Sequence, residues 1–206
     1  MKKLKNNLLI IFYRNPELGK VKTRLAATLG DANALAIYLK LVAHTRAITL
    51  NLSMDKMVCY SNYVDREDSW SNENYDKQLQ QGKELGDRLS HAIKIGFNKG
   101  YKAVCVIGTD NLELTTKLIE EAFVKLKTHE AVIGPAKDGG YYLLGLRKFI
   151  PEPFENKKWS TSSVCQDTLN DFQRIGLSYD MLPVLTDVDT ETDLPDEIRT
   201  KLNGHP

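Results

Sequence analysis

The stretch Lys102-Ala-Val-Cys-Val-Ile-Gly-Thr-Asp110 decides the fold. Its apolar residues, 103–107, run without alternation, as expected for a strand that is buried on both faces of a mainly parallel sheet. In open α/β sheets, ligands bind beyond the carboxyl ends of such strands. Asp110 lies at such an end, where its carboxylate could hold a cation against a ligand's phosphates. It could equally cap the following turn, and the stretch alone leaves both interpretations open.

The composition indicates an ordinary globular chain. The 206 residues suit one α/β domain, and 42% of them are hydrophobic and 27% charged. The net charge of +1 gives no reason to expect a nucleic acid or a membrane as partner. Cys59 and Cys105 lie in apolar runs, which indicates buried thiols in a reducing compartment. The apolar run 8–12 is too short for a signal peptide or a membrane span, so we expect a cytoplasmic protein.

Hydrophobic periodicity predicts strands that alternate with helices. The expected strands are 8–13, 57–60, 103–107, 131–134, 141–146 and 181–185. The expected helices are one that begins near residue 23, then 32–48, 85–98, 115–127, 160–175 and 193–202. The polar stretch 61–81 shows little periodicity. The alternation implies parallel βαβ units, so residues 1–206 are expected to form a single α/β domain around a mainly parallel sheet.

A basic loop, residues 14–24, follows the first expected strand. Its Lys20, Lys22 and Arg24 crowd the start of a helix, where free N–H groups and the helix dipole favour anions. Three cations are unfavourable there unless an anion offsets them, which favours a phosphate ligand over a solvated basic turn. The Walker A spacing is missing.

Carboxylates also follow the last expected strand. Two strand-end acids from distant parts of the sequence can converge on one divalent cation, which takes oxygen ligands and shares phosphate oxygens. We expect Asp110 and Asp187 to be that pair. Asp189 and Asp193 have a plainer interpretation as turn and N-cap residues before the last helix.

The segment Gly134-Pro-Ala-Lys-Asp-Gly-Gly-Tyr-Tyr142 predicts a hairpin, because Asp-Gly and Gly-Gly allow the positive φ of a tight reversal. Glycines also let the backbone approach a ligand, and the two tyrosines could stack on a base or sugar. Trp159 could add a second wall, or belong to a helix cap with an aromatic staple. A structural turn and a ligand-binding turn both stay open.

Other catalytic classes find little support. The four histidines are scattered without metal-ligand spacing. No Gly-x-Ser-x-Gly elbow occurs, and no Gly-x-Gly-x-x-Gly follows the first strand, which argues against a serine hydrolase and a dinucleotide cofactor.

The ordered motifs resemble the DUF2064 family, also labelled transferase 1 of radical-SAM and selenodomain contexts. They are Pro16-x-x-Gly-Lys-x-Lys-Thr-Arg-Leu25, Gln81-Gly with Leu85-Gly-x-Arg88, Ile107-Gly-Thr-Asp110, Gly134-Pro-Ala-x-Asp-Gly-Gly-Tyr-Tyr-Leu143, Trp159-Ser-Thr161 and Asp187-Val-Asp-Thr190. The resemblance spans nearly the whole chain. One departure is Asn111-Leu112, where the family usually has Ser-Pro, and it puts the loop beyond Asp110 in doubt.

The resemblance implies a GT-A-like (nucleotide-diphospho-sugar transferase) fold, with Mg²⁺ or Mn²⁺ as cofactor. Carried over by position, Lys20, Lys22 and Arg24 would bind phosphates, and Asp110 would bind the metal. We also expect Arg88 to bind phosphate, Asp187 to share the metal, and Asp110 and Asp138 to act in catalysis. The residues expected to bind the sugar or acceptor are Gly139, Gly140, Tyr141 and Trp159.

The same family is commonly labelled glycosyltransferase, in some members linked to arsenosugar synthesis. The Lys-x-Lys-Thr-Arg loop is also similar to that of the phospholactate guanylyltransferases. The family label favours glycosyl transfer, whereas the basic loop favours nucleotidyl transfer. We place glycosyl transfer first and expect transfer from a nucleotide-sugar to a small-molecule acceptor. The alternatives are nucleotidyl transfer from a nucleoside triphosphate and a non-catalytic nucleotide-binding domain. A homodimer is compatible with the sequence, which does not fix the oligomeric state.

Overall fold

The stretch around Ala103–Ile107 forms β4, which lies inside a seven-stranded sheet of order β3-β2-β1-β4-β6-β5-β7. The computed structural model describes residues 6–203. The strands are β1 (Asn7–Tyr13), β2 (Asp55–Tyr60), β3 (Asp76–Leu79), β4 (Ala103–Ile107), β5 (Ala131–Pro135), β6 (Tyr141–Leu146) and β7 (Tyr179–Met181). Strand β6 is antiparallel to its neighbours β4 and β5, and the other pairs are parallel. The expectation of a mainly parallel sheet is confirmed.

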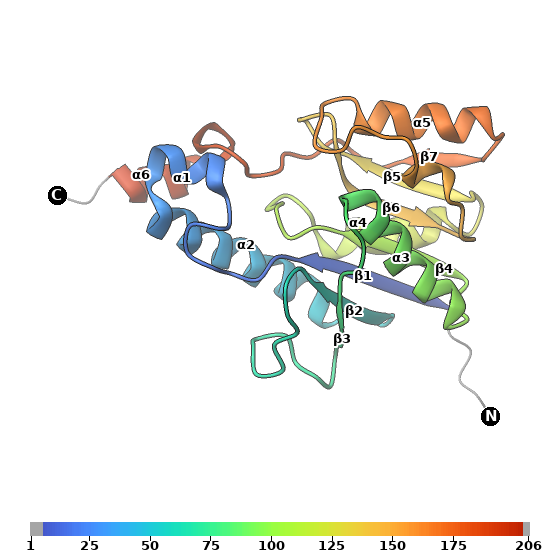
Figure 1. The fold of residues 1–206 in the computed structure, drawn as a ribbon, viewed down its shortest axis with the longest axis horizontal. Helices are drawn as coiled ribbons and strands as arrows, with labels where there is room; N and C mark the ends of the chain where they lie inside the picture. The colour runs from blue at the N-terminus through green and yellow to red at the C-terminus, as the bar shows by residue number, and fades with distance from the viewer. Residues whose placement is uncertain (1–5, 204–206) are drawn as a thin grey trace.

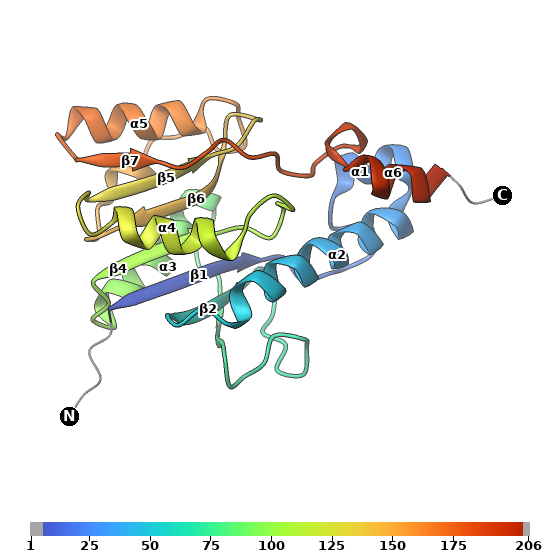
Figure 2. The same ribbon diagram turned by 180° about the vertical axis from the view of Figure 1, so that it is seen from behind.

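Helices cover both faces of this sheet, as the two opposite views show (Figures 1 and 2). They are α1 (Thr23–Leu29), α2 (Asp31–Leu50), α3 (Leu85–Asn98), α4 (Thr116–Lys125), α5 (Val164–Arg174) and α6 (Asp196–Asn203), with 3₁₀ turns η1 (Glu152–Phe154) and η2 (Glu191–Asp193). Helices α3 and α5 lie on the face seen in Figure 1, and α2 and α4 lie on the face seen in Figure 2. None of the helices in the described chain is long and apolar enough to span a membrane.

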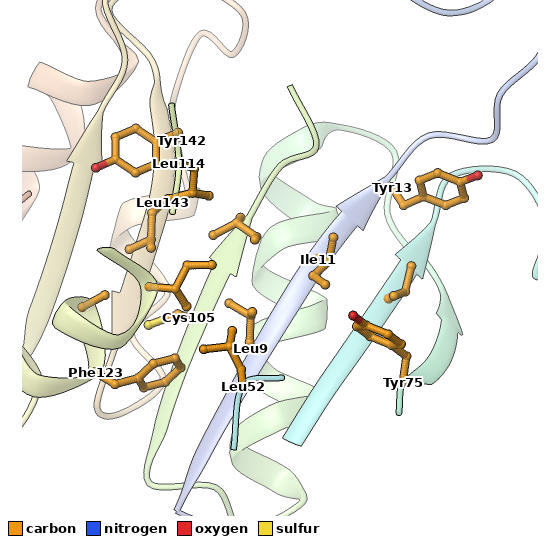
Figure 3. Close-up of a cluster of buried hydrophobic side chains, with 14 of the residues drawn as sticks. Leu9, Ile11, Tyr13, Leu52, Tyr75, Cys105, Leu114, Phe123, Tyr142 and Leu143 are labelled. Carbon is orange, nitrogen blue, oxygen red and sulfur yellow. The ribbon is translucent and has the colours of Figure 1, made fainter. Parts of the chain in front are cut away.

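The core consists of two main hydrophobic clusters, one on each face of the sheet. Leu9, Ile11 and Cys105 belong to the cluster under α2 and α4, together with Phe123 of α4 (Figure 3). The intervening residues of the same strands, among them Ile10, belong to the cluster under α3 and α5. Both faces of β1 and β4 are therefore buried, and this explains why their sequences are continuously apolar. Full burial of such a side chain stabilises the fold by roughly 1.5–3 kcal/mol.

Four elements differ clearly from the sequence-based expectation. The closing helix α6 begins at Asp196, not at residue 193, because Asp193 ends the 3₁₀ turn η2. Strand β3 lies within the polar stretch 61–81, because an edge strand whose Lys77 is paired with Asp68 carries no apolar alternation. Helix α5 begins at Val164, not near residue 160, and the preceding segment is irregular. The late strand is shifted to 179–181, and Leu185 contributes only an isolated bridge to Ala136.

Candidate active site

A crevice of about 860 Å³ opens at the carboxyl ends of β1 and β4. The predicted site residues that line it are Lys22, Arg24, Arg88, Asp110, Asp138, Gly140, Tyr141, Trp159 and Asp187. Two predicted residues, Lys20 and Gly139, are not among its lining residues. The structure thus brings together side chains that are far apart in the sequence: Lys22 and Asp189, in contact here, are 167 positions apart.

The two acids that were expected to pair lie on adjacent segments. The main-chain carbonyl of Asp110 accepts a hydrogen bond from the N–H of Val188 at 2.8 Å, and Asn111 forms an isolated bridge with Asp187. The Asn111 side chain donates Nδ2–H to Asp187 Oδ1 at 3.0 Å. Its own Oδ1 accepts from the N–H groups of Glu113 and Leu114 at 2.8 Å each. Asn111 therefore closes the turn after Asp110 and orients Asp187 at the same time.

Asp187 carries the clearest electrostatic signature of the crevice. Burial raises the pKa of its carboxyl and outweighs the hydrogen bond from Asn111, which lowers it. The nearby negative charges of Asp110 and Asp138 act in the same direction as burial, Lys22 acts against it, and the net pKa is about 6. The charges of Asp110 and Asp138 therefore act on Asp187 within one crevice, and a cation near these carboxylates would be stabilised.

Three cations of the basic loop, Lys20, Lys22 and Arg24, are paired with carboxylates. Lys22 Nζ lies 2.6 Å from Asp110 Oδ1 and 3.1 Å from Asp189 Oδ1. Arg24 pairs with Asp189 at 2.8 Å. Lys20 points elsewhere and pairs with Glu17 at 2.7 Å. The premise that these cations need an external anion is wrong, because protein carboxylates already offset all three. Phosphate binding by these three residues stays a prediction, which now rests on the resemblance of their motif alone.

Asp189 and Asp193 separate into different roles. Asp189 accepts from Lys22 and Arg24, so its interpretation as a turn residue missed an ion pair across the crevice. Asp193 forms the capping box of η2, since its carboxylate accepts from both the N–H and the hydroxyl of Thr190 at 2.7 Å. Asp189 belongs to the motif Asp187-Val-Asp-Thr190, but no local pattern predicted its ion pairs, because the partners lie far away in the chain.

Further cations line the crevice without a carboxylate partner in residues 6–203. Arg88 uses Nε–H to bind the main-chain carbonyl of Gly82 at 3.1 Å, and this bond leaves the end of its guanidinium free. Arg14 and Lys83 also line the crevice and form no ion pair within those residues. Of these three residues only Arg88 was predicted, through its motif. Arg14 and Lys83 lacked any distinguishing spacing.

The glycine turn 136–140 joins β5 to β6 and positions a neighbouring segment. Gly139 has a φ of +88°, and a Cβ at this position would lie 2.0 Å from the carbonyl oxygen of Ser162. The Gly139 carbonyl accepts from the N–H of Cys165 at 2.9 Å. The predicted hairpin is present, and Gly139 serves close packing against residues 162–165. Gly140 and Asp138, joined by a 2.8 Å hydrogen bond, face the crevice.

The aromatic residues contribute in different ways. Tyr141 lines the crevice, but its hydroxyl is buried and has no hydrogen-bond partner in the described chain. A polar contact from that hydroxyl to a ligand would require the side chain to move. Trp159 packs against the start of α3, where a Cβ on Gly86 would lie 2.4 Å from the indole Nε1. Only a glycine at position 86 lets the indole form this wall of the crevice.

A divalent cation fits this site only if the ligand contributes to its coordination. In the part of the chain that the structure describes, no group of three or more His, Cys, Asp and Glu side chains could hold a metal alone. Mg²⁺ is commonly bound by one or two carboxylates together with substrate phosphates and water. Asp110 and Asp187, with their mutual repulsion, match that donor set.

Comparison with known proteins identifies the family and the fold of the chain. The family model of uncharacterised proteins conserved in bacteria, DUF2064, matches residues 44–161. The chain belongs to the DUF2064 family. A candidate nucleotide-diphospho-sugar transferase from Desulfovibrio desulfuricans G20 is 34% identical, with a TM-score of 0.85 over 96% of this chain and 88% of that one. This similarity confirms both the predicted family and the predicted nucleotide-diphospho-sugar transferase fold of this DUF2064 protein.

More distant structures share the fold alone. The inositol-1-phosphate CTP transferase from T. maritima is 11% identical, with a TM-score of 0.60 over 97% of both chains. The 4-diphosphocytidyl-2C-methyl-D-erythritol synthase from Anaerococcus prevotii DSM 20548 is 13% identical, with a TM-score of 0.56 over 97% of this chain and 96% of that one. No curated protein matches the DUF2064 chain.

The raised pKa of Asp187 predicts a specific pH dependence of stability. Between the ordinary carboxyl value of 3.8 and about 6, the folded protein binds more protons at Asp187 than the unfolded chain does. The free energy of unfolding should therefore fall as the pH rises through this window, by up to roughly 3 kcal/mol from this group. Asp187→Asn keeps an oxygen acceptor for Asn111 but cannot titrate. Denaturant unfolding without metal from pH 4 to 7 should show the parent losing stability relative to Asp187→Asn, and a constant difference would contradict the assignment.

Proposed function

We propose that this DUF2064 protein is a metal-dependent glycosyltransferase that transfers a sugar from a nucleotide-sugar to a small-molecule acceptor. The observation that supports this most directly is the clustering of Asp110, Asp138 and Asp187 in one crevice at the strand ends. Arg88 adds an unpaired cation to the same crevice. The similarity to the Desulfovibrio protein supports the nucleotide-sugar as donor.

The proposed roles follow from position and charge. Arg88 would contact the diphosphate, because its guanidinium is directed by Gly82 and offers free donors to phosphate oxygens. Asp138 would accept a proton or hydrogen bond from the acceptor hydroxyl, since it lies at the exposed rim of the crevice. The face of Trp159 would pack against the sugar or acceptor.

Asp110 and Asp187 would hold Mg²⁺ or Mn²⁺, and the metal would neutralise charge that develops on the diphosphate leaving group. Asn111 would support this site by fixing the Asp187 carboxylate, and by closing the turn that sets the direction of Asp110. The substitution of the usual Ser-Pro by Asn111-Leu112 therefore leaves the acid pair in place.

Nucleotidyl transfer is a second candidate, favoured by the number of unpaired cations. Arg14, Lys83 and Arg88 line the crevice without carboxylate partners in the described residues, and a triphosphate carries more charge to neutralise than a diphosphate. In that reaction the leaving group would be pyrophosphate instead of a nucleoside diphosphate.

A thermal-shift panel of nucleoside triphosphates and nucleotide-sugars, with and without Mg²⁺ or Mn²⁺, tests these functions. Binding to the folded state stabilises it by mass action, by about 2.7 kcal/mol at a hundredfold excess over Kd. Any ligand that shifts the Tm is then incubated with pools of acceptors. Release of nucleoside diphosphate supports glycosyl transfer, and release of pyrophosphate supports nucleotidyl transfer. Binding without turnover of any acceptor would favour a non-catalytic nucleotide-binding domain.

Arg88→Met should weaken nucleotide binding while the protein stays folded. A charge-assisted hydrogen bond is worth about 1.5–3 kcal/mol, so we expect Kd to rise by roughly tenfold or more. Isothermal titration calorimetry with the nucleotide found in the panel measures this change. Arg147→Met is the matched control, because Arg147 also donates to a main-chain carbonyl, that of Lys127, but lies outside the crevice. If the two variants bind the nucleotide with equal affinity, Arg88 does not contribute to nucleotide binding.

A further inference from the structure

The Lys22 ammonium lies against the carboxylate of Asp110, which is proposed to bind the metal ion. Its Nζ lies 2.6 Å from Asp110 Oδ1 and 3.1 Å from Asp189 Oδ1, and the side chain is only 6% exposed. Burial disfavours its charge, but Asp110 and Asp189 outweigh burial and raise the pKa of Lys22. The crevice therefore contains a cation of its own, seated against the carboxylate that is proposed to bind metal.

The backbone conformation of Lys22 directs its side chain towards these acids. Lys22 has a φ of +49° and a ψ of +46°, a left-handed conformation that non-glycine residues rarely adopt. Lys22 immediately precedes α1. Its side chain extends across the crevice to Asp110, which follows β4, and to Asp189. Its flexible four-carbon stem allows the ammonium to reach other positions without movement of the helix.

A divalent cation bound to Asp110 competes with the ammonium for the charge of this carboxylate. Mg²⁺ binds carboxylate oxygen at about 2.0–2.1 Å, so an ion on Asp110 would stand beside Lys22 Nζ and repel it. Nucleotide phosphates supply the negative charge that could receive the displaced ammonium. Entry of the metal on Asp110 and transfer of Lys22 to phosphate would then favour each other.

We propose that Lys22 is the resident counterion of the metal site: it neutralises Asp110 and Asp189 while the nucleotide is absent, and moves to the nucleotide phosphates when metal and nucleotide bind together. This inference rests on the proposed function, because it assumes the metal on Asp110. It makes metal and nucleotide binding reciprocal: each ligand should raise the affinity of the other by the same factor. Metal alone should bind weakly, because it must displace Lys22 with nothing to receive it.

Lys22→Met tests the inference through metal binding alone, without turnover. Methionine keeps the length of the side chain and removes the charge. Mn²⁺ titrated into the nucleotide-free protein, followed by electron paramagnetic resonance, should bind Lys22→Met at least tenfold more tightly than the parent. Mn²⁺ should also raise the Tm of Lys22→Met more than that of the parent. Lys125→Met is the control, because Lys125 forms an equally short pair, 2.6 Å from Asp180, outside the crevice.

The outcomes separate this inference from the proposed function. If Mn²⁺ binds Lys22→Met no more tightly than the parent, while the parent binds Mn²⁺ together with nucleotide, only the counterion role is overturned. If the parent and Lys22→Met both fail to bind Mn²⁺ with or without nucleotide, the metal site and the counterion role fall together. If Lys22→Met does not fold, Lys22→Gln replaces it, because glutamine loses the charge but keeps a polar end. Tighter Mn²⁺ binding to Lys22→Gln than to the parent then supports the counterion role, and equal binding overturns it.

Discussion

Asp110→Asn should abolish metal-dependent nucleotide binding and leave the protein folded. Asparagine keeps the shape of the side chain but not the charge, so the site loses the carboxylate that is proposed to hold the metal. We expect an affinity loss of roughly 3 kcal/mol or more, about a hundredfold, when nucleotide is titrated in the presence of Mn²⁺. Lys22 keeps Asp189 as a partner in this variant, so the ammonium is not left buried and unpaired.

Asp180→Asn provides the matched control for this experiment. Asp180 pairs with Lys125 at 2.6 Å, as Asp110 pairs with Lys22, but lies at β7 away from the crevice. Its loss should leave nucleotide affinity unchanged. If Asp110→Asn binds Mn²⁺ and nucleotide as the parent does, Asp110 is a turn residue, and the metal-site hypothesis is wrong.

Gly139→Ala should destabilise the fold strongly, although Gly139 lies outside the crevice lining. Its φ of +88° strains any side chain, and the added Cβ would lie 2.0 Å from the Ser162 carbonyl oxygen. Left-handed strain costs about 1–2 kcal/mol, and overpacking against main chain adds roughly 1–3 kcal/mol. We expect a loss of about 4 kcal/mol in the free energy of unfolding, measured by denaturant titration, with impaired ligand binding because residues 159–163 are displaced.

Gly100→Ala isolates the contribution of the clash. Gly100 has almost the same φ, +90°, but an added Cβ there meets nothing within 4 Å. This variant should show only the strain of the backbone. Similar losses for Gly139→Ala and Gly100→Ala would mean that the hairpin moves freely from residue 162, contrary to the packing described above.

The sequence was sufficient to predict most of the fold, because buried strands and amphipathic helices have local signatures. Residues 103–107 are apolar without a break, and they form β4 with every residue buried. Residues 85–98 show helical periodicity and form α3 with the same boundaries. Strand β3 was missed because its Lys77 is buried by a salt bridge to Asp68, a contact that no local pattern announces.

The site was predicted less completely, since partners across a crevice are not encoded by spacing. The strand-end position of Asp110 was correctly located, because strand ends follow from the apolar pattern. The pairing of Lys22 with Asp110 and Asp189 could not be foreseen, because it depends on how the first loop folds back over β4. Asn111 was regarded as a departure from the family, yet it orients Asp187.

The place of β1 has a consequence for how the chain can be assembled. This strand comes first in the described sequence but lies between β2 and β4 in the middle of the sheet. During synthesis on the ribosome, the edge of β1 that pairs with β4 therefore stays uncovered until residues 103–107 have been made. Asp187 and Asp189 emerge later still, so a nascent chain can complete the β1–β4 pairing before the acidic side of the crevice exists. Residues 44–161, which the family model matches, include β4 but neither β1, its partner in the middle of the sheet, nor Asp187 and Asp189.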